Sequence, residues 1–270
     1  MQGSPSISPA LPVITEKNET NITKMKTILQ RRTIRRYKSD DVSPELLNKL
    51  FAAASRTQTM GNLQLYSVIV TRDAQMKHKL APAHFNQPMV EQAPVVLTVC
   101  ADFRRTTDWC EARKANPGYN NFLSFINAAT DALLFTQSFC HLAEEEGLGY
   151  CFLGTTVYMP QLIIDALHLP QLVMPVATLT LGWPDECPPL SDRLSPAAFV
   201  HEETYKEYTP EDIDRYYTEK EQLPENQEFV RINKKETLAQ VFTDCRYTRS
   251  DNEALSATLL EALRRQGFLQ

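Results

Sequence analysis

The sequence has no excess of basic residues and no grouped metal-binding side chains. Its 270 residues carry 28 Lys and Arg against 33 Asp and Glu, which gives a net charge of −5 at pH 7. Non-specific nucleic-acid binding needs a global positive field, and this chain lacks one. The five histidines form no H-x-x-x-H or comparable cluster. We therefore expect no metal site and no nucleic-acid partner.

Paired cysteines and long apolar runs are missing as well. The six cysteines occur singly, with no C-x-x-C pair, and several lie inside apolar runs; this pattern is typical of reduced core residues in a cytosolic protein. No apolar run approaches the roughly 18 to 20 residues that span a bilayer. Residues 1–24 are rich in Ser, Pro, Thr and Asn and lack the features of a secretion signal. We expect a disordered arm there, followed by a cytoplasmic globular protein with no membrane partner.

The sequence does contain one dense basic run, which reads Arg31-Arg32-Thr33-Ile34-Arg35-Arg36-Tyr37. A planar guanidinium offers paired donors and a permanent charge, so arginine is well suited to holding a phosphate. The run follows a segment with helical spacing over residues 23–32. On its own it fits either an anion cradle at a helix-to-loop junction or a solvated basic turn.

Apolar segments predict four strands, over residues 66–70, 94–101, 150–153 and 175–181. Ser43 followed by Pro44 predicts a helix start, and further helices are expected over 160–169 and 251–266. A long helix over 121–146 is apolar on nearly every face. That pattern predicts burial all round, in the core or in a subunit interface. The charged segment from Asp108 to Asn121 is expected to be irregular.

Gly147-Leu148-Gly149 does not fit a dinucleotide-binding fingerprint. It follows a helix and precedes a strand, the reverse of the order which that fingerprint needs. We interpret Gly147 as a left-handed helix cap. The polar loop over residues 56–64 fits either turn chemistry or a set of neutral donors and acceptors for a ring system. Residues 202–226 are dense in charge and tyrosine, which indicates an extension that lies over another surface.

Several spaced motifs resemble those of the nitroreductase family of FMN-dependent oxidoreductases, and within it the NADPH-dependent flavin reductase branch. The resemblance covers residues 25–208. The motifs are Arg31-Arg32-Thr33-Ile34-Arg35, Leu63-Gln64, Cys100-Ala101-Asp102-Phe103, Leu181-Gly182-Trp183-Pro184, Pro189-Leu190, Arg193-Leu194, Val200-His201-Glu202 and Tyr205.

This resemblance implies an α+β fold in which helices flank a mostly antiparallel central sheet. It also implies an interlocked homodimer with FMN in each of two interfacial clefts. The FMN-binding domain would cover residues 25–208, and residues 209–270 would form a C-terminal extension that packs on the core or on the partner subunit. A monomer with a fully buried long helix remains the alternative.

The resemblance further implies a set of cofactor-binding residues: Arg31, Arg32, Thr33, Arg35, Thr59, Gln87, Leu153, Gly154, Thr155 and Arg193. The first three would hold the FMN phosphate and ribityl chain, and Arg193 would close the phosphate from the other end. Arg35 would reach the N1/C2 edge of the ring, where a fixed cation stabilises the negative charge of two-electron reduction. Thr59 and Gln87 would bond the polar edge of the ring, with Gln87 preferred over Gln64. Residues 153–155 would approach the ring by their backbone.

The implied activity is ping-pong hydride transfer from NADPH or NADH, through FMN, to a nitroaromatic, a quinone or a free flavin. No Ser-His-Asp, Cys-His or paired-carboxylate constellation is present in the sequence, and a flavin enzyme of this kind demands no protein acid or base. The alternatives are an FMN-binding protein with little reductase turnover and a dehalogenase or dehydrogenase variant of the family. A nucleic-acid module built on the basic run is opposed by the acidic balance.

The chain departs from the family pattern at three places. Ser191 stands where the branch has a lysine, and Val157 stands where a basic residue is expected. The basic loop for the NADPH 2′-phosphate is not recognisable, which leaves the donor preference open. The candidates for it also fit ordinary surface charges: Arg231, Lys234, Lys235, Arg246 and Arg249.

Overall fold

The computed structural model describes residues 26–269 and divides the chain into two units, Met1–Arg31 and Arg32–Gln270. Residues 26–29 are helical, which confirms part of the helix predicted over residues 23–32; residues 31 and 32 are not helical. The arm expected over residues 1–24 lies outside the described residues. The fold below is that of the second unit.

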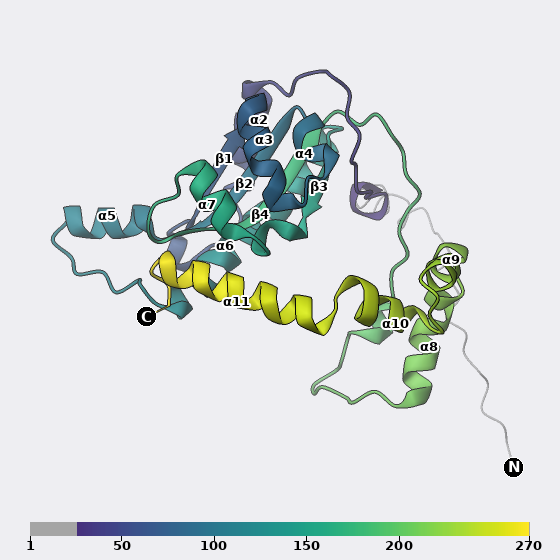
Figure 1. Ribbon diagram of the computed structural model, residues 1–270. Helices are drawn as coiled ribbons and strands as arrows, with labels where there is room; N and C mark the ends of the chain where they lie inside the picture. The colour runs from purple at the N-terminus through teal and green to yellow at the C-terminus, as the bar shows by residue number, and fades with distance from the viewer. Residues whose placement is uncertain (1–25, 270) are drawn as a thin grey trace, which may run out of the picture. The chain divides into compact units, whose positions relative to one another are not determined.

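Across the described residues, one sheet has four strands in the order β1-β2-β4-β3 (Figure 1). They are β1 (Tyr66–Thr71), β2 (Val95–Asp102), β3 (Gly149–Leu153) and β4 (Val173–Gly182). All neighbouring strands are antiparallel. Every residue of β2 and β4 is buried, because both strands are central and have helices on both faces. The predicted strands and the antiparallel α+β class are confirmed.

One face of the sheet packs on α6 (Phe122–Glu145) and α2 (Pro44–Ala54), through a core that includes Phe139, Leu97 and Leu179. The other face is covered by α3 (Ala74–Leu80), η2 (Ala81–His84), α4 (Pro88–Gln92) and α7 (Pro160–Leu167). Leu80, Ile163 and Leu153 belong to this second core. Burying one such leucine or isoleucine side chain contributes about 1.5–3 kcal/mol.

Two of the expected helix ends are confirmed. Ser43 begins α2, where its Oγ accepts a hydrogen bond from the Leu46 amide at 3.2 Å. Gly147 ends α6 with φ +84°, and the Leu148 amide donates to the Ala143 carbonyl at 2.9 Å. The left-handed conformation costs glycine little, which is why glycine stands at this position.

The long helix α6 is not buried all round in the single chain, which excludes burial in the core of one subunit and leaves burial in a subunit interface as a prediction. An apolar row along it is solvent-exposed: Leu123 is 68% exposed, Ile126 43%, Leu133 43% and Leu134 46%. Spacings of three, seven and eight residues place these side chains on one side of the helix. The opposite side faces the sheet, with Phe135 and Phe139 in the core.

Two further expectations need correction. The segment from Asp108 to Asn121 is not irregular throughout, because α5 (Arg104–Ala112) extends into it. The only fully buried residue of α5 is Thr106, so the helix has no buried apolar stripe from which it could be predicted. The cysteines are core residues only in part, since Cys187 and Cys245 are exposed.

The C-terminal segment forms α8 (Pro210–Glu221), α9 (Pro224–Ile232), α10 (Leu238–Val241) and α11 (Arg249–Arg265), with the 3₁₀ turn η4 (Pro196–Ala198) before it. In the described chain, neither α8 nor α9 buries a side chain fully. Leu263 of α11 and Phe268, which follows it, join the main core. Figure 1 shows α11 extending from α10 towards α7. No helix within residues 26–269 has the length and apolar character needed to cross a membrane.

Candidate functional site

The basic segment lies over the ends of β3 and β4. The Ile34 amide donates to the Tyr150 carbonyl at 2.9 Å, and Tyr37 forms an isolated bridge with Pro184. The Tyr37 hydroxyl donates to the Ile34 carbonyl at 2.6 Å and also contacts Thr180. Because Ile34 is buried and the backbone is extended, the side chains on either side of it point outward. Thr33 and Arg35 are therefore both exposed.

Two glycines allow this close approach. Gly149 and Gly182 are partners in the register of β3 and β4. A Cβ at Gly149 would lie 2.6 Å from Ile34 Cγ1, and a Cβ at Gly182 would lie 2.7 Å from Pro94 Cδ and 3.0 Å from Tyr37 Cδ1. Both positions thus lack room for a methyl group.

Glu186 fixes the same segment from the loop after β4. Its Oε1 accepts hydrogen bonds from the amides of Arg35 at 2.5 Å and Arg36 at 2.9 Å, and its Oε2 accepts from Arg36 Nε at 3.1 Å. These bonds, the Arg35 amide first, hold the pKa of Glu186 below its usual value. Arg32 Nε donates to the Pro188 carbonyl at 2.7 Å, so the same loop also contacts the segment at Arg32.

The Arg35 side chain lies near Cys151, in the middle of β3. Burial raises the pKa of the Cys151 thiol, and the neighbouring Arg35 guanidinium opposes that rise. Leu153 is buried at the end of the strand. It is followed by the turn η3 (Gly154–Val157). A Cβ built at Gly154 would meet nothing within 4 Å, so the backbone at this turn faces open space.

His84 joins this turn to the loop that carries Gln87. The His84 side chain is fully buried, and its Nδ1 lies 2.8 Å from Thr155 Oγ1. Burial lowers the pKa of His84 to about 4, so the ring is neutral at pH 7. Its Nε2 has no hydrogen-bond partner within the described residues. Gln87 begins α4, and its amide donates to the His84 carbonyl at 3.1 Å.

Thr59 comes from a different place in the chain. It precedes the turn η1 (Met60–Asn62), which packs on α6. Asp131 of α6, only 2% exposed, accepts hydrogen bonds from the amides of Met60 at 2.9 Å and Leu65 at 3.2 Å. Gln64 lies in this loop with φ +53°. The loop is thus fastened to α6, while the arginine segment is fastened to β3.

Arg193 lies in the exposed loop between β4 and η4, where its Nη1 donates to the Asp192 carbonyl at 2.7 Å. Lys220 of α8 forms an ion pair with the Asp192 carboxylate at 2.6 Å. Ser191 is exposed beside them. Lys220 therefore brings a cation to this loop, which sequence reasoning missed.

The contacts place the predicted residues in separate groups. Arg32, Thr33 and Arg35 belong to the segment bonded to Tyr150, near the start of β3. Leu153, Gly154 and Thr155 lie at the other end of that strand, where His84 links Thr155 to the loop that carries Gln87. Arg193 shares its loop with Glu186 and Pro188, and Thr59 belongs to the η1 loop on α6. Arg31 ends the separate unit Met1–Arg31. The role of every one of these residues stays a prediction.

Sequence reasoning did not find Glu186, His84 or Asp131. Asp131 gave the clearest signal, because an acidic residue inside an apolar helix must find donors when it is buried. Glu186 and His84 lie in segments where no spacing of residues predicts a functional or structural role for them.

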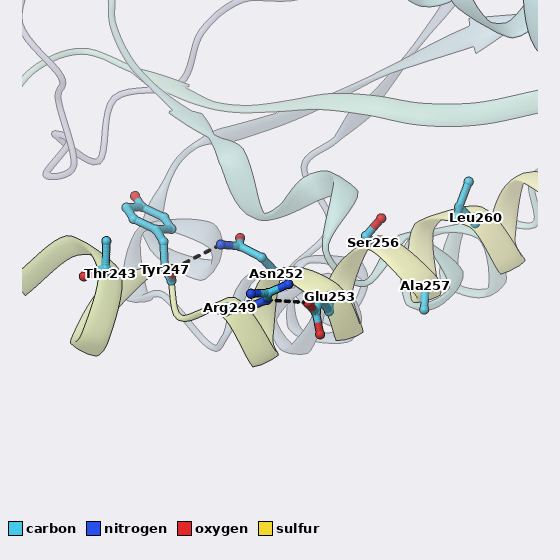
Figure 2. A pocket seen from close by; sticks show the side chains of 8 residues that line it. All are labelled: Thr243, Tyr247, Arg249, Asn252, Glu253, Ser256, Ala257 and Leu260. Atoms are coloured by element: carbon cyan, nitrogen blue, oxygen red, sulfur yellow. Dashed lines mark hydrogen bonds and ion pairs between the residues drawn. The ribbon is translucent and has the colours of Figure 1, made fainter. Parts of the chain in front are cut away.

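A cavity of about 610 Å³ lies along the π-helical turn η5 (Phe242–Arg246) and α11 (Figure 2). Arg249 lines it and is paired with Glu253 at 2.9 Å. Most of the other basic residues considered for a nucleotide phosphate are engaged too: Arg231 with Glu228, Lys235 with Asp244, and Arg246 over the Phe229 ring. None of these contacts marks a phosphate site.

Comparison with known proteins identifies the family. A family model described as "Nitroreductase family" matches residues 28–183. The FMN reductase [NAD(P)H] of Bacillus subtilis (strain 168) is 32% identical over 183 residues, covering 67% of this chain and 74% of the relative. The oxygen-insensitive NADPH nitroreductase of Salmonella typhimurium is 30% identical over 185 residues, covering 68% and 75%.

Solved structures agree. A Bacteroides fragilis NCTC 9343 crystal structure superposes with a TM-score of 0.90 at 60% identity, covering 91% of this chain and all of that one. The NfrA1 nitroreductase of B. subtilis superposes with a TM-score of 0.79 at 25% identity, covering 90% and 98%. The chain belongs to the nitroreductase family, which confirms the resemblance seen in the sequence.

Proposed function

We propose that the protein is an FMN-dependent oxidoreductase that uses NAD(P)H to reduce nitroaromatics, quinones or flavins. The observation that carries the proposal is the exposed Thr33 and Arg35 pair, held on β3 by the hydrogen bond from Ile34 to Tyr150, on the strand that leads into the open backbone of Gly154. Relatives named as NAD(P)H-dependent FMN reductase and NADPH nitroreductase support it.

The residues present fit FMN. The cofactor has an anionic phosphate, a hydroxylated chain and a flat ring with a polar edge. The arginine segment offers fixed cations and a hydroxyl. The open backbone at Gly154 offers a flat approach for a ring, and the neighbouring Gln87 and Thr155 offer neutral polar groups. The buried Nε2 of His84, without a partner in the described chain, adds polar capacity next to that turn.

Each residue has a distinct task in this proposal. Arg31, Arg32, Thr33 and Arg193 hold the phosphate and ribityl chain. Arg35 places its charge at the N1/C2 edge of the ring, where negative charge gathers on reduction. Gln87 and Thr59 bond the polar edge, and residues 153–155 support the ring by their backbone. Bound FMN supplies the hydride chemistry, while the chain binds, orients and excludes water.

One cleft would serve donor and acceptor in turn, which is the ping-pong order. NADPH and NADH both stay open as donors. The acceptor is a small planar molecule that can lie on the same face as the nicotinamide.

The protein acts as a homodimer in this proposal. The exposed row of Leu123, Ile126, Leu133 and Leu134 on α6 supplies an apolar surface for a second copy. The η1 loop with Thr59 is fastened to the same helix by Asp131. Dimerisation would therefore bring Thr59 of one subunit to the arginine segment of the other. The weakly buried C-terminal segment, residues 209–270, would pack partly on the partner.

A cytoplasmic location is part of the proposal. All six cysteines are free thiols, and two of them are exposed. Exposed free thiols persist in reducing compartments.

The test is the visible absorption spectrum of the purified protein, followed by anaerobic titration with NADPH and, on a fresh sample, NADH. We expect a flavin spectrum that bleaches with at least one nucleotide. Bound FMN that neither nucleotide bleaches would indicate an FMN-binding protein without reductase turnover. A protein that carries no flavin and binds no added FMN would refute the proposal.

A further inference from the structure

Glu186 stands in an unexpected place for an acidic residue. Its side chain is only 16% exposed and lies against the segment that we propose binds the phosphate and ring of FMN. A carboxylate there opposes the binding of an anion through its charge. A structural role must therefore offset this electrostatic cost.

The contacts of Glu186 show that structural role. One oxygen accepts the amides of two consecutive residues, Arg35 at 2.5 Å and Arg36 at 2.9 Å, and the other accepts Arg36 Nε at 3.1 Å. Charge-assisted hydrogen bonds are about twice as strong as neutral ones. Both amides belong to a stretch with no strand or helix of its own, so Glu186 satisfies donors that secondary structure leaves open.

The same contacts give the side chains of Arg35 and Arg36 different environments. Glu186 engages the guanidinium of Arg36 directly, whereas it holds only the backbone of Arg35. The Arg35 side chain is left to extend along β3 towards Cys151, whose pKa it influences. The carboxylate thus pairs with the guanidinium of Arg36 and holds the backbone from which the Arg35 side chain extends.

We propose that Glu186 is a positioning residue that sets the direction of Arg35 at the flavin ring and withholds Arg36 from it. This inference rests on the proposed FMN function and adds to it a residue outside the cofactor-binding set. In this role Glu186 acts on the cofactor through the backbone of Arg35 and not by direct contact.

Two roles for Glu186 predict opposite results. If only its charge matters, removing it raises the affinity for the anionic cofactor. If its position matters, removing it lowers the affinity, because Arg35 loses its fixed base. Glu186→Asp separates the roles further, since it keeps the charge but is one methylene too short to hold both amides.

Asp185 is the matched control. It belongs to the same loop, its side chain is exposed, and its backbone amide donates to the Arg36 carbonyl at 3.0 Å. Asp185→Ala removes the same charge from the same loop while keeping that backbone bond.

The experiment is titration of flavin-free full-length protein with FMN, followed by flavin fluorescence, together with the midpoint potential of each FMN complex. We expect Glu186→Ala and Glu186→Asp to raise the FMN Kd about tenfold. Asp185→Ala should leave the Kd unchanged or lower it. The potential should fall in Glu186→Asp, because Arg35 no longer faces the ring while the loop charge is unaltered.

Wild-type affinity and potential in Glu186→Asp, or tighter binding in Glu186→Ala, would overturn the positioning role. If the wild-type protein itself binds no FMN, the proposed function fails and this inference fails with it. Circular dichroism melting of the flavin-free proteins separates loss of binding from loss of folding. If Glu186→Ala does not fold, Glu186→Asp alone decides.

Discussion

Lowering the pH should destabilise the fold through His84. This side chain is fully buried, and burial lowers its pKa from 6.5 to about 4. Above pH 6.5 the ring is neutral in both the folded and the unfolded chain, so it has no effect on the pH dependence. As the pH falls below 6.5, the unfolded chain takes up a proton that the folded chain refuses, and stability is lost until the folded pKa is reached.

The size of the effect follows from the two pKa values. The free energy of unfolding should fall by about 2 kcal/mol at pH 5 and by about 3 kcal/mol below pH 4 from this group alone. His84→Asn keeps a polar atom near Thr155 Oγ1 and removes the titrating ring. At pH 7.5 the wild type should be the more stable of the two, because the variant loses packing and leaves space.

The assay is urea unfolding of the wild type and His84→Asn at pH 7.5, 6 and 5. The contacts of Glu186 and Asp212 lower the pKa values of these carboxylates, so their protonation in acid also destabilises the fold. Their contribution is the same in both proteins and cancels in the difference. The advantage of the wild type should shrink by about 2 kcal/mol between pH 7.5 and pH 5. A difference that stays constant with pH would refute the reasoning.

Three substitutions test the proposed site and assembly. Arg35→Ala should weaken FMN retention and lower its reduction potential, since the cation at the ring edge is lost; unchanged flavin content and potential would remove Arg35 from the site. Arg193→Ala should release FMN without unfolding the dimer, measured as flavin per subunit after gel filtration, and full occupancy would count against the phosphate role. Leu134→Glu should shift sedimentation towards the monomer, because a buried unpaired carboxylate costs several kcal/mol; an unchanged dimer would place the interface elsewhere.

The sequence predicts those parts of the fold that depend on neighbours along the chain. The strands follow from apolar runs, and the ends of α2 and α6 follow from a capping serine and a glycine. The helix α5 is not predicted because its apolar residues, Trp109, Cys110 and Ala112, do not form a stripe along one face, and none of them is fully buried. For α6 the sequence predicts the apolar residues but leaves open whether they face a core or a subunit interface, because composition does not distinguish the two.

The missed site residues act over long separations in sequence. Glu186 meets Arg35 across 151 positions, and Asp131 meets Met60 across 71. No periodicity links such pairs, so only the folded chain reveals them. The motif Arg31 to Arg35 is found from sequence because its residues are contiguous, yet the sequence does not say what holds it in place.

The arginine segment packs directly on Gly149 and Gly182. An alanine at either position would overlap Ile34, or Pro94 and Tyr37, and the segment would have to rise off the sheet to make room. The displaced atoms would belong to no charged group, yet every guanidinium on the segment would shift with them. The absence of a side chain at Gly149 and Gly182 therefore sets the distance between the arginine segment and the sheet. Substitutions at these glycines would move the arginines relative to the rest of the site without changing any of its charges.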